Sequence, residues 1–186
     1  SVFMLQEGWA YSFKLLRDGR RQIVGFAVPG DFLGLHSVLL PKSNYSAMTL
    51  TDAVVSEVDA ERLGRIIRRR PGLGSAILWS ASWDTAMLVE HLVDVGRRNA
   101  IERLARLLLE LQVRLELVGL GSDRGFECPL TQGMLADALG LSIVHVNRTL
   151  RQLRERGLAT VDSGRVVVNN PEGLRALAAC ENIYPH

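Results

Sequence analysis

The sequence predicts an α+β fold, in which a β-rich N-terminal segment precedes a long helix and a C-terminal winged helix-turn-helix. Three observations carry this prediction. Turn signals recur about every ten residues in the first third of the chain, as expected for short strands. Apolar residues then follow helical spacing through two long segments. Near the C-terminus, two helical segments meet at a glycine and are followed by a strand, a turn and a strand.

The composition is that of a folded globular protein of one or two domains. The chain has 186 residues, of which 47% are hydrophobic and 23% charged, with a formal net charge of +2. No apolar run approaches the roughly 18 residues of a membrane span, and no signal-peptide pattern opens the chain. We therefore expect a cytoplasmic protein that does not contact a membrane.

Residues 1–59 are expected to form strands of a sandwich, barrel or jelly roll. Val2–Leu5 is an apolar run. Asp18-Gly19, a pair typical of hairpin turns, joins strands over Trp9–Leu16 and Arg21–Val28. Further apolar segments of this β region cover Phe32–Leu40, Tyr45–Thr51 and Ala53–Asp59. Because the chain begins without an initiator Met and already at a run typical of a buried strand, we expect it to be a fragment or to have lost its beginning.

The apolar period becomes helical at residue 60. A short helix is predicted over Ala60–Arg70, ended by Pro71-Gly72. We interpret its Arg68-Arg69-Arg70 end as a solvated helix C-terminus, where positive charge is favourable. Contact of these arginines with DNA or a partner is the alternative.

A second helix is predicted over Leu73–Arg97, and its apolar residues, including Trp79 and Trp83, form more than one stripe. One stripe is enough to pack on the β region. A second long stripe usually marks a contact between helices, so we interpret this segment as the dimerisation helix of a homodimer. A core helix of one larger domain is the alternative.

The helical pattern breaks at Gly96-Arg97-Arg98-Asn99, which is the hinge candidate. Ala100–Leu117 is then predicted to be an amphipathic helix, Gly119–Gly125 a loop and Pro171–Ala179 a terminal helix. On the amphipathic helix the polar positions away from the apolar face are Arg103, Arg106, Glu110 and Arg114. These breaks divide the chain into a β domain over residues 1–71, a helix and hinge over 72–98, and a C-terminal domain over 99–186.

Residues 131–156 carry the most informative pattern, because they resemble two helices joined by a tight turn. Gly140 supplies the positive φ that such a turn requires, and Ser142 is an N-cap candidate for the second helix. The apolar positions that converge on one side are Leu135, Leu139, Leu141, Val146, Leu150 and Leu153. The outer face keeps side chains that can donate to bases or phosphates, namely His145, Asn147, Arg148 and Arg151. DNA binding is therefore predicted, and a helical hairpin with a solvated basic face is the alternative.

A β-hairpin is predicted directly after these helices. Leu158–Val161 and Arg165–Val168 flank the turn residues Asp162-Ser163-Gly164. Between Ser142 and Arg165 there are five Arg against one Glu and one Asp, a local net charge of +3 beside +2 for the whole chain. Positive charge is thus concentrated where a phosphate backbone would lie.

The cysteines and histidines do not form a metal-ligand pattern. Cys128 and Cys180 are far apart and are interpreted as free thiols in a reducing cytosol, a redox role being the alternative. The four His (36, 91, 145 and 186) are scattered, without an HxH pair or a Glu at ligand spacing. We therefore expect no metal site, no cofactor and no enzymatic activity of the jelly-roll kind.

The order of these elements resembles the cyclic-AMP receptor protein/fumarate-nitrate regulator (CRP/FNR) family of bacterial transcription factors. The most specific parts are Gly30-Asp31-Phe32-Leu33-Gly34 and the segment from Leu130 to Leu150. The resemblance implies a cyclic-nucleotide-binding-like β-roll over residues 1–71, from which the first strands are missing, and a winged-helix DNA-binding domain over 99–186. It implies a homodimer on an inverted-repeat site in double-stranded DNA, with half-site centres about 34 Å apart. RNA polymerase is a further candidate partner.

Residue by residue, the resemblance assigns phosphate contacts to Thr131 and Ser142, the base-reading arginine to Arg148 and another reading position to Asn147. Ile143 and Val144 depart from the family, because many members carry a charged or polar pair there, often ending in Glu. These two side chains cannot accept from a cytosine amine but could touch a thymine methyl, so the preferred site should differ from the common family consensus. The full candidate set is Thr131, Gln132, Ser142, Ile143, Val144, His145, Asn147, Arg148, Arg151, Ser163 and Arg165.

The effector pocket that the family implies departs further. Cyclic-nucleotide binders carry a Glu for the ribose and an Arg for the phosphate, where this chain has Leu35 and Tyr45, the latter followed by Ser46. An anionic phosphate would lose its charge-assisted pair, so we expect a regulator that does not depend on cyclic nucleotides, with an unidentified or absent effector. Two scattered Cys cannot hold an iron–sulfur cluster. Haem ligation by His36 is left open, a surface or core histidine being the other interpretation.

Two functions follow from this pattern. The first is a sequence-specific DNA-binding transcriptional regulator. The alternative is a degenerate nucleotide-binding-like module that acts through protein partners. Salt-sensitive DNA affinity would distinguish them, because neutralising phosphates releases counterions.

Overall fold

The computed structural model describes residues 1–38, 40 and 43–179. The chain forms two compact units, Ser1–His91 and Leu92–His186, and each is described by itself. The boundary between them falls inside one long helix, α2 (Pro71–Arg97). The three-part division into residues 1–71, 72–98 and 99–186 stays a prediction.

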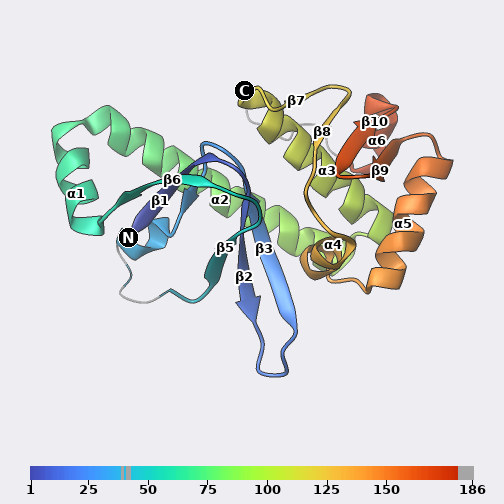
Figure 1. Ribbon diagram of the computed structural model, residues 1–186, viewed down its shortest axis with the longest axis horizontal. Coiled ribbons are helices and arrows are strands. Elements are labelled where there is room, and N and C mark those ends of the chain that lie inside the picture. The colour runs from blue at the N-terminus through green and yellow to red at the C-terminus, as the bar shows by residue number, and fades with distance from the viewer. Residues whose placement is uncertain (39, 41–42, 180–186) are drawn as a thin grey trace. The chain divides into compact units, whose positions relative to one another are not determined.

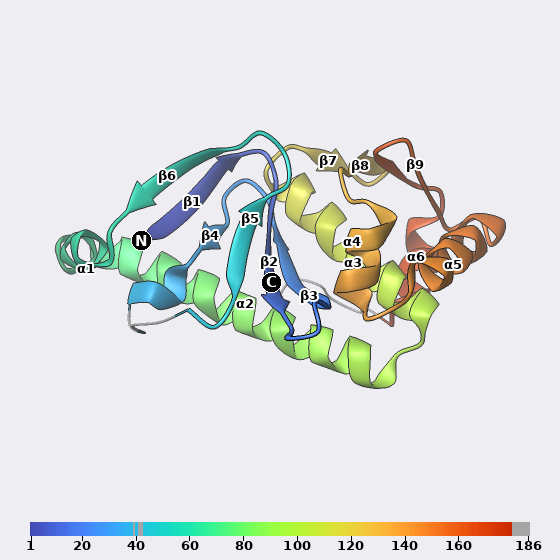
Figure 2. The ribbon, with the colours of Figure 1, turned by 60° about the horizontal axis from the view of Figure 1, so that its bottom comes forward.

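The N-terminal unit contains two three-stranded antiparallel sheets, as expected for a β-roll (Figures 1 and 2). The first sheet has β1 (Val2–Glu7) between β4 (Phe32–Leu33) and β6 (Val54–Val58). The second has β2 (Ala10–Leu15) between β3 (Arg21–Ala27) and β5 (Ser46–Thr49). The chain passes from one sheet to the other at Gly8, whose φ is +86°. A Cβ there would lie 2.2 Å from the carbonyl oxygen of Asp52, so only glycine fits this corner.

The expectation of a strand-like segment through Phe32–Leu40 was wrong beyond its first two residues. The strand β4 ends at Leu33, and a 3₁₀ helix covers Leu35–Val38. Gly34 between them has a φ of +73°, which a β-strand cannot accommodate. Leu35 then packs against a core cluster formed by Val2, Leu63 and Ile77.

Two helices complete the N-terminal part of the fold. α1 (Ala60–Arg69) begins at Asp59, whose carboxylate accepts a hydrogen bond from the backbone N–H of Arg62 at 2.7 Å. α2 follows at once, with Pro71 as its first residue, where the missing N–H costs nothing. α2 buries Ile77 and Met87 but leaves a row of large apolar side chains exposed, namely Leu78, Trp79, Leu88, Val89, Leu92, Val93 and Val95.

The C-terminal unit is built around α3 (Ala100–Leu117), as predicted from the apolar spacing. The other helices are α4 (Gln132–Leu139), α5 (Ile143–Glu155) and α6 (Pro171–Leu177). Large side chains from all four helices are at most 1% exposed and form its core, among them Leu104, Leu108, Leu111, Leu115, Leu135, Val146, Leu153 and Leu174. α5 and α6 pack on α3. Every residue from Leu104 to Gln112 is buried, so α3 is covered on all sides over these turns and not only on its predicted apolar face.

The loop expected over Gly119–Gly125 contains two short strands instead. β7 (Gly121–Ser122) and β8 (Gly125–Glu127) extend the predicted hairpin of β9 (Ala159–Asp162) and β10 (Arg165–Val168) into a four-stranded sheet, in the order β7-β8-β10-β9. The strands escaped prediction because glycine begins each of them and neither is long enough to show an alternating pattern. Among the described residues, no helix is long and apolar enough to cross a membrane.

Candidate DNA-binding site

The turn between α4 and α5 has the geometry that the sequence predicted. Gly140 ends α4 with φ 65° and ψ 38°, a left-handed conformation that glycine adopts without strain. The N–H of Leu141 then donates to the carbonyl of Ala136 at 3.0 Å, which closes the turn. The direction of α5 is therefore set within three residues of the end of α4.

Hydroxyl side chains cap both helices. Thr131 Oγ1 accepts from the N–H of Met134 at 3.2 Å, and Ser142 Oγ accepts from the N–H of His145 at 3.2 Å. These contacts confirm Ser142 as an N-cap and give Thr131 the same role. Because each hydroxyl acts as acceptor in its cap, its own hydrogen can still be donated to a phosphate oxygen.

α5 has a buried face and an exposed face. Val146, Thr149 and Leu153 are at most 1% exposed, and the Thr149 hydroxyl is satisfied by donating to the carbonyl of His145 at 2.8 Å. The opposite face presents exposed side chains at positions three and four apart, namely Val144, Asn147, Arg148 and Arg151. That spacing places them on one side of the helix, so four of the predicted site residues lie together.

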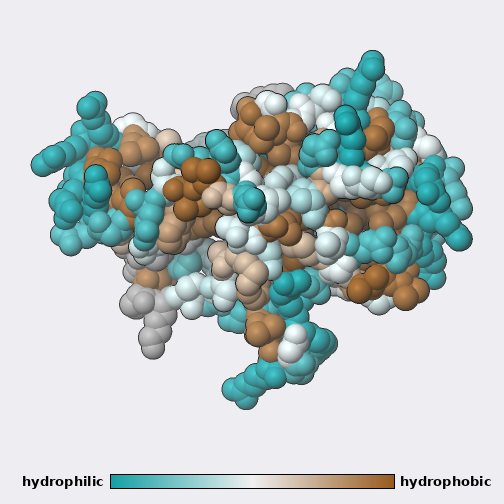
Figure 3. Space-filling view, in the orientation of Figure 1, coloured by the Kyte–Doolittle hydropathy of each residue, from teal (hydrophilic) through white to brown (hydrophobic). Residues whose placement is uncertain are grey.

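The first turn of α5 is apolar where a solvent-facing helix is usually polar. Val144 is 79% exposed, the most of any large hydrophobic side chain in the described part of the chain, and Ile143 is 52% exposed. Figure 3 shows hydrophobic surface near the start of this helix and hydrophilic surface along its outer side. Gln132 is exposed on the first turn of α4, whereas His145 is only half-exposed.

The hairpin that follows α5 carries the remaining predicted residues. Ser163 and Gly164 form its turn, both with positive φ, and Ser163 and Arg165 are exposed. Arg165 lies 3.6 Å from the Glu127 carboxylate, and Arg151 lies 3.3 Å from that of Glu155. Both ion pairs are exposed, so they contribute little and can be exchanged for a phosphate contact. Among the described residues, no carboxylate forms an ion pair with Arg148.

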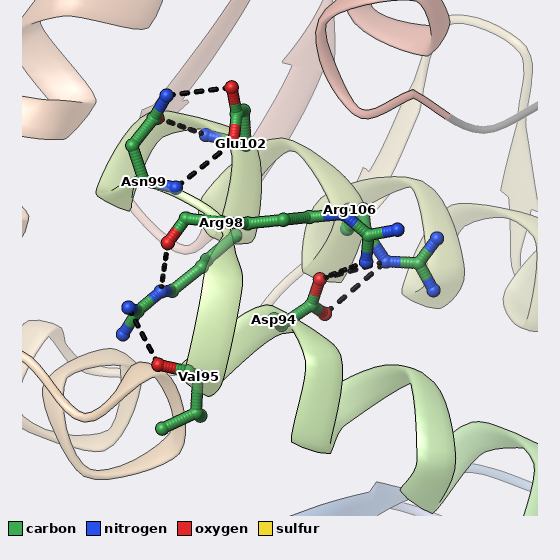
Figure 4. A network of polar contacts seen from close by, with 7 residues as sticks. Asp94, Val95, Arg98, Asn99, Glu102 and Arg106 are labelled. Atoms are coloured by element: carbon green, nitrogen blue, oxygen red, sulfur yellow. Dashed lines mark hydrogen bonds and ion pairs between the residues drawn. The ribbon is translucent and has the colours of Figure 1, made fainter.

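Sequence reasoning missed a set of charged side chains that joins α2 to α3. Asp94 is 7% exposed and accepts from Arg98 and from Arg106 Nε at 3.2 Å, and Arg106 itself is 8% exposed (Figure 4). Asn99 and Glu102 form a capping box at the start of α3. Arg106 and Glu110, expected away from the apolar face, are buried because each reaches an opposite charge, on Asp94 and Arg114 respectively.

Arg103, also expected away from the apolar face, contacts three backbone carbonyls. Its guanidinium donates to Val95 at 2.9 Å, to Arg98 at 2.8 Å and to Leu139 at 3.0 Å. In the sequence, Arg103 is recognisable only as a charged residue in the first turn of a predicted helix, and such a residue is ordinarily exposed.

The residues predicted for an effector pocket do not share one environment. Leu35 packs on the core, Ser46 is exposed, and Tyr45 Oη lies 2.8 Å from His36 Nδ1. Burial raises the pKa of the Tyr45 phenol, and the negative charge of Asp84 raises it further.

No cluster of three His, Cys, Asp or Glu side chains that could hold a metal ion occurs in the described ranges. Cys128 is buried, which raises the pKa of its thiol and disfavours the reactive thiolate. Cys180 lies outside the described residues.

Two models of known protein families match this chain. Residues 102–177 match the Crp-like helix-turn-helix domain, and residues 1–70 match the cyclic nucleotide-binding domain. The nitrogen fixation regulation protein FixK of Bradyrhizobium diazoefficiens is 37% identical over 179 residues, covering 96% of this chain and 74% of the relative. The transcriptional activatory protein AadR of Rhodopseudomonas palustris is 35% identical over 181 residues, again covering 96% and 74%.

A solved structure is similar over almost the whole chain. FixK2 from Bradyrhizobium japonicum has a TM-score of 0.85 and 29% identity, and the match covers 97% of this chain and 88% of that one. Fold, exposed helix and matched domains together define a DNA-binding transcriptional regulator. The chain belongs to the CRP/FNR family, as the order of its elements had indicated.

Proposed function

We propose that the chain acts as a homodimer on an inverted-repeat site in double-stranded DNA, with α5 of each protomer in successive major grooves. The observation that carries this proposal is the exposed face of α5, on which Val144, Asn147, Arg148 and Arg151 lie at helical spacing. The protein works in the cytoplasm, where it reaches chromosomal DNA and RNA polymerase. No residue is assigned a catalytic role.

The site residues divide into two groups. Arg148 reads guanine through its O6 and N7 atoms, because a guanidinium matches both acceptors at once, and Asn147 reads a neighbouring base. Side chains around this pair contact phosphates and fix the register of the protein on the duplex. This second group comprises Thr131, Gln132, Ser142, His145, Arg151, Ser163 and Arg165.

Replacing Arg148 and Arg165 by Ala separates base reading from phosphate contact. Arg148→Ala should lose about 1–3 kcal/mol of specific binding and relax the choice at one base pair in each half-site. Arg165→Ala should weaken specific and random DNA alike and flatten the salt dependence. Fluorescence anisotropy titrations on both DNAs at several salt concentrations measure these effects. Equal losses of both variants on both DNAs would contradict the assigned roles.

Ile143 and Val144 are proposed to recognise thymine through its methyl group. Two exposed apolar side chains at the start of the recognition helix offer no hydrogen bond, so the 5-methyl group is the feature of a base edge that they can bind. This contact removes apolar surface from water, at about 25 cal/mol per Å².

Deoxyuridine tests this contact, because it keeps the hydrogen-bonding pattern of thymidine and lacks only the methyl group. Replacing the contacted thymidine by deoxyuridine should weaken binding of the wild-type protein several-fold, on the order of 1 kcal/mol. The same replacement should have little effect on Val144→Ala or on Ile143→Ala, whichever side chain makes the contact. If both variants lost as much affinity as the wild type, neither side chain would touch the methyl group.

The dimer contact is proposed to lie on the exposed apolar row of α2. Leu88 and Leu92 are 51% and 74% exposed in the single chain, and covering such a row is the usual reason that a helix keeps it.

Leu92→Glu or Leu88→Glu should dissociate the dimer, because a charge would be buried without a partner. Leu117→Glu is the matched control, since Leu117 is 68% exposed on α3, outside the proposed contact. Light scattering at micromolar concentration should give about twice the 20.6 kDa chain mass for wild type and control, and the chain mass for the variants. A wild-type monomer that still binds the inverted repeat would rule out this dimer.

Cyclic nucleotides are proposed not to control DNA binding. Tyr45 stands where the resemblance to the family predicts a phosphate-binding Arg. Its hydroxyl lies beside His36, and Asp84 adds a negative charge that raises the pKa of the phenol. A cyclic phosphate would therefore be desolvated next to a carboxylate without a guanidinium.

Calorimetry with millimolar cyclic AMP and cyclic GMP should show no binding, and either nucleotide should leave the DNA titration unchanged. A ligand shifts a conformational equilibrium only through its different affinity for the two states. Micromolar binding together with DNA affinity about tenfold tighter would show that Leu35 and Tyr45 do not block the pocket.

A further inference from the structure

We propose that Arg103 is a positioning residue for DNA recognition, which holds the helix-turn-helix at a fixed angle to the last turn of α2. It thereby sets the separation and direction of the two α5 helices in a dimer. The inference rests on the proposed function, in which α2 forms the dimer and α5 reads DNA. Arg103 itself touches no base or phosphate in this proposal.

The first observation is the set of acceptors around one guanidinium. Nη2 donates to Val95 in the last turn of α2, Nε to Arg98 between the two helices, and Nη1 to Leu139 at the end of α4. Carbonyls in the last turn of a helix lack intrahelical partners and carry the negative end of its dipole. The donors of a guanidinium form a rigid planar fork, so three bonds to one fork restrict all three backbone segments together.

The second observation is the buried Asp94 beside this fork. Its carboxylate accepts from Arg98 and from Arg106, which lies on the second turn of α3 (Figure 4). Asp94 therefore ties the end of α2 to α3, while Arg103 ties both to α4. All of these residues belong to the Leu92–His186 unit.

The contacts of Arg103 and Asp94 together form a joint between α2, α3 and α4. The turn that starts α5 lies directly against this joint. A Cβ placed on Gly140 would be 3.8 Å from Cγ1 of Val95 and 4.0 Å from Nη1 of Arg103. Only Gly140 and Leu141 separate Leu139 from Ser142, the N-cap of α5. A shift of the Leu139 carbonyl is therefore transmitted to the first turn of α5, where the base-reading residues begin.

DNA geometry makes such a joint measurable. Half-sites lie one helical turn apart, and adding or removing one base pair moves the second half-site along the axis and rotates it around the duplex. A rigid joint tolerates neither change, so the intact protein should discriminate strongly between spacings. A loosened joint should discriminate less, although the side chains that contact the bases are unchanged.

The test compares wild type, Arg103→Ala and Arg103→Lys. Each protein is titrated on an inverted repeat selected from random DNA for tight binding (the selected repeat), on the same repeat with one base pair added to or removed from its spacer, and on a single half-site. Arg103→Ala should bind the selected repeat about tenfold more weakly, as expected for losing hydrogen bonds from a charged donor. Its preference among spacings should fall while its affinity for a single half-site stays within about twofold. Arg103→Lys should behave similarly, since one ammonium cannot bond three separated carbonyls.

Arg114→Ala is the matched control, because Arg114 lies eleven residues beyond Arg103 on the same helix and pairs with Glu110 there. It should keep the wild-type spacing preference. If Arg103→Ala does not fold by circular dichroism, Arg103→Lys decides the matter by the same ratios. Equal losses on every DNA, including the half-site, or an unchanged spacing preference, would overturn the proposal. A wild-type protein that ignores spacing would instead show that the proposed dimeric recognition is wrong.

Discussion

The buried charges between α2 and α3 are the constraint on which the C-terminal unit depends. Asp94 and Arg106 are both less than a tenth exposed, and each would be costly to bury alone. Such a pair is weak evidence of stability, because well-packed apolar residues can stabilise a fold as well. What distinguishes this pair is its directionality. A carboxylate between two guanidinium groups accepts good hydrogen bonds in only a few relative orientations of α2 and α3. Apolar side chains at the same positions would allow the helices to rotate and slide.

The apolar core supports this joint and presents α5. Val146 and Leu153 are buried on one side of α5. Because the helical repeat of 3.6 residues places the intervening residues on the other side, this burial also determines which side chains face outward. The burial that holds α5 in place and the side chains proposed to read DNA thus lie on opposite faces of one helix. Val144 shows the separation clearly: a β-branched apolar residue left 79% exposed contributes almost nothing to folding. Its exposure is what the proposed contact with a thymine methyl group requires.

Most of the fold could be predicted because its signals are local. Gly140, Ser142 and Pro71 each define a helix end through the backbone within four residues of themselves, and the apolar period of α3 predicts its helical conformation. The structure confirms these elements. The strands β7 and β8 and the 3₁₀ helix at Leu35 were missed, because each is too short to show a period. β8 pairs with the distant strand β10, and Leu35 packs against Leu63 and Ile77, so contacts remote in sequence support both segments.

The candidate site was predictable to the same extent and for the same reason. Val144, Asn147, Arg148 and Arg151 share a face by spacing alone. Arg103 was not predictable in its role, since one of its acceptors lies 36 residues away on α4. A charged side chain in a helical pattern gives no sign of whether its partner is water or a carbonyl from another helix. Residues that position a site are therefore harder to read from a sequence than residues that contact the ligand.

The chemistry around Tyr45 bears on what such a regulator can respond to. A ligand must bind one conformation more tightly than another to shift the population, and an anionic ligand at Tyr45 would face Asp84. If no ligand binds one conformation more tightly than the other, the protein concentration still controls how much of the inverted repeat is occupied. When two chains must associate before both half-sites are filled, occupancy of the inverted repeat rises more steeply than in proportion to concentration, until the dimer is fully formed. In the proposed dimer, the apolar row of α2 would determine how many dimers exist, and the contacts of Arg103 would determine whether each dimer fits its DNA.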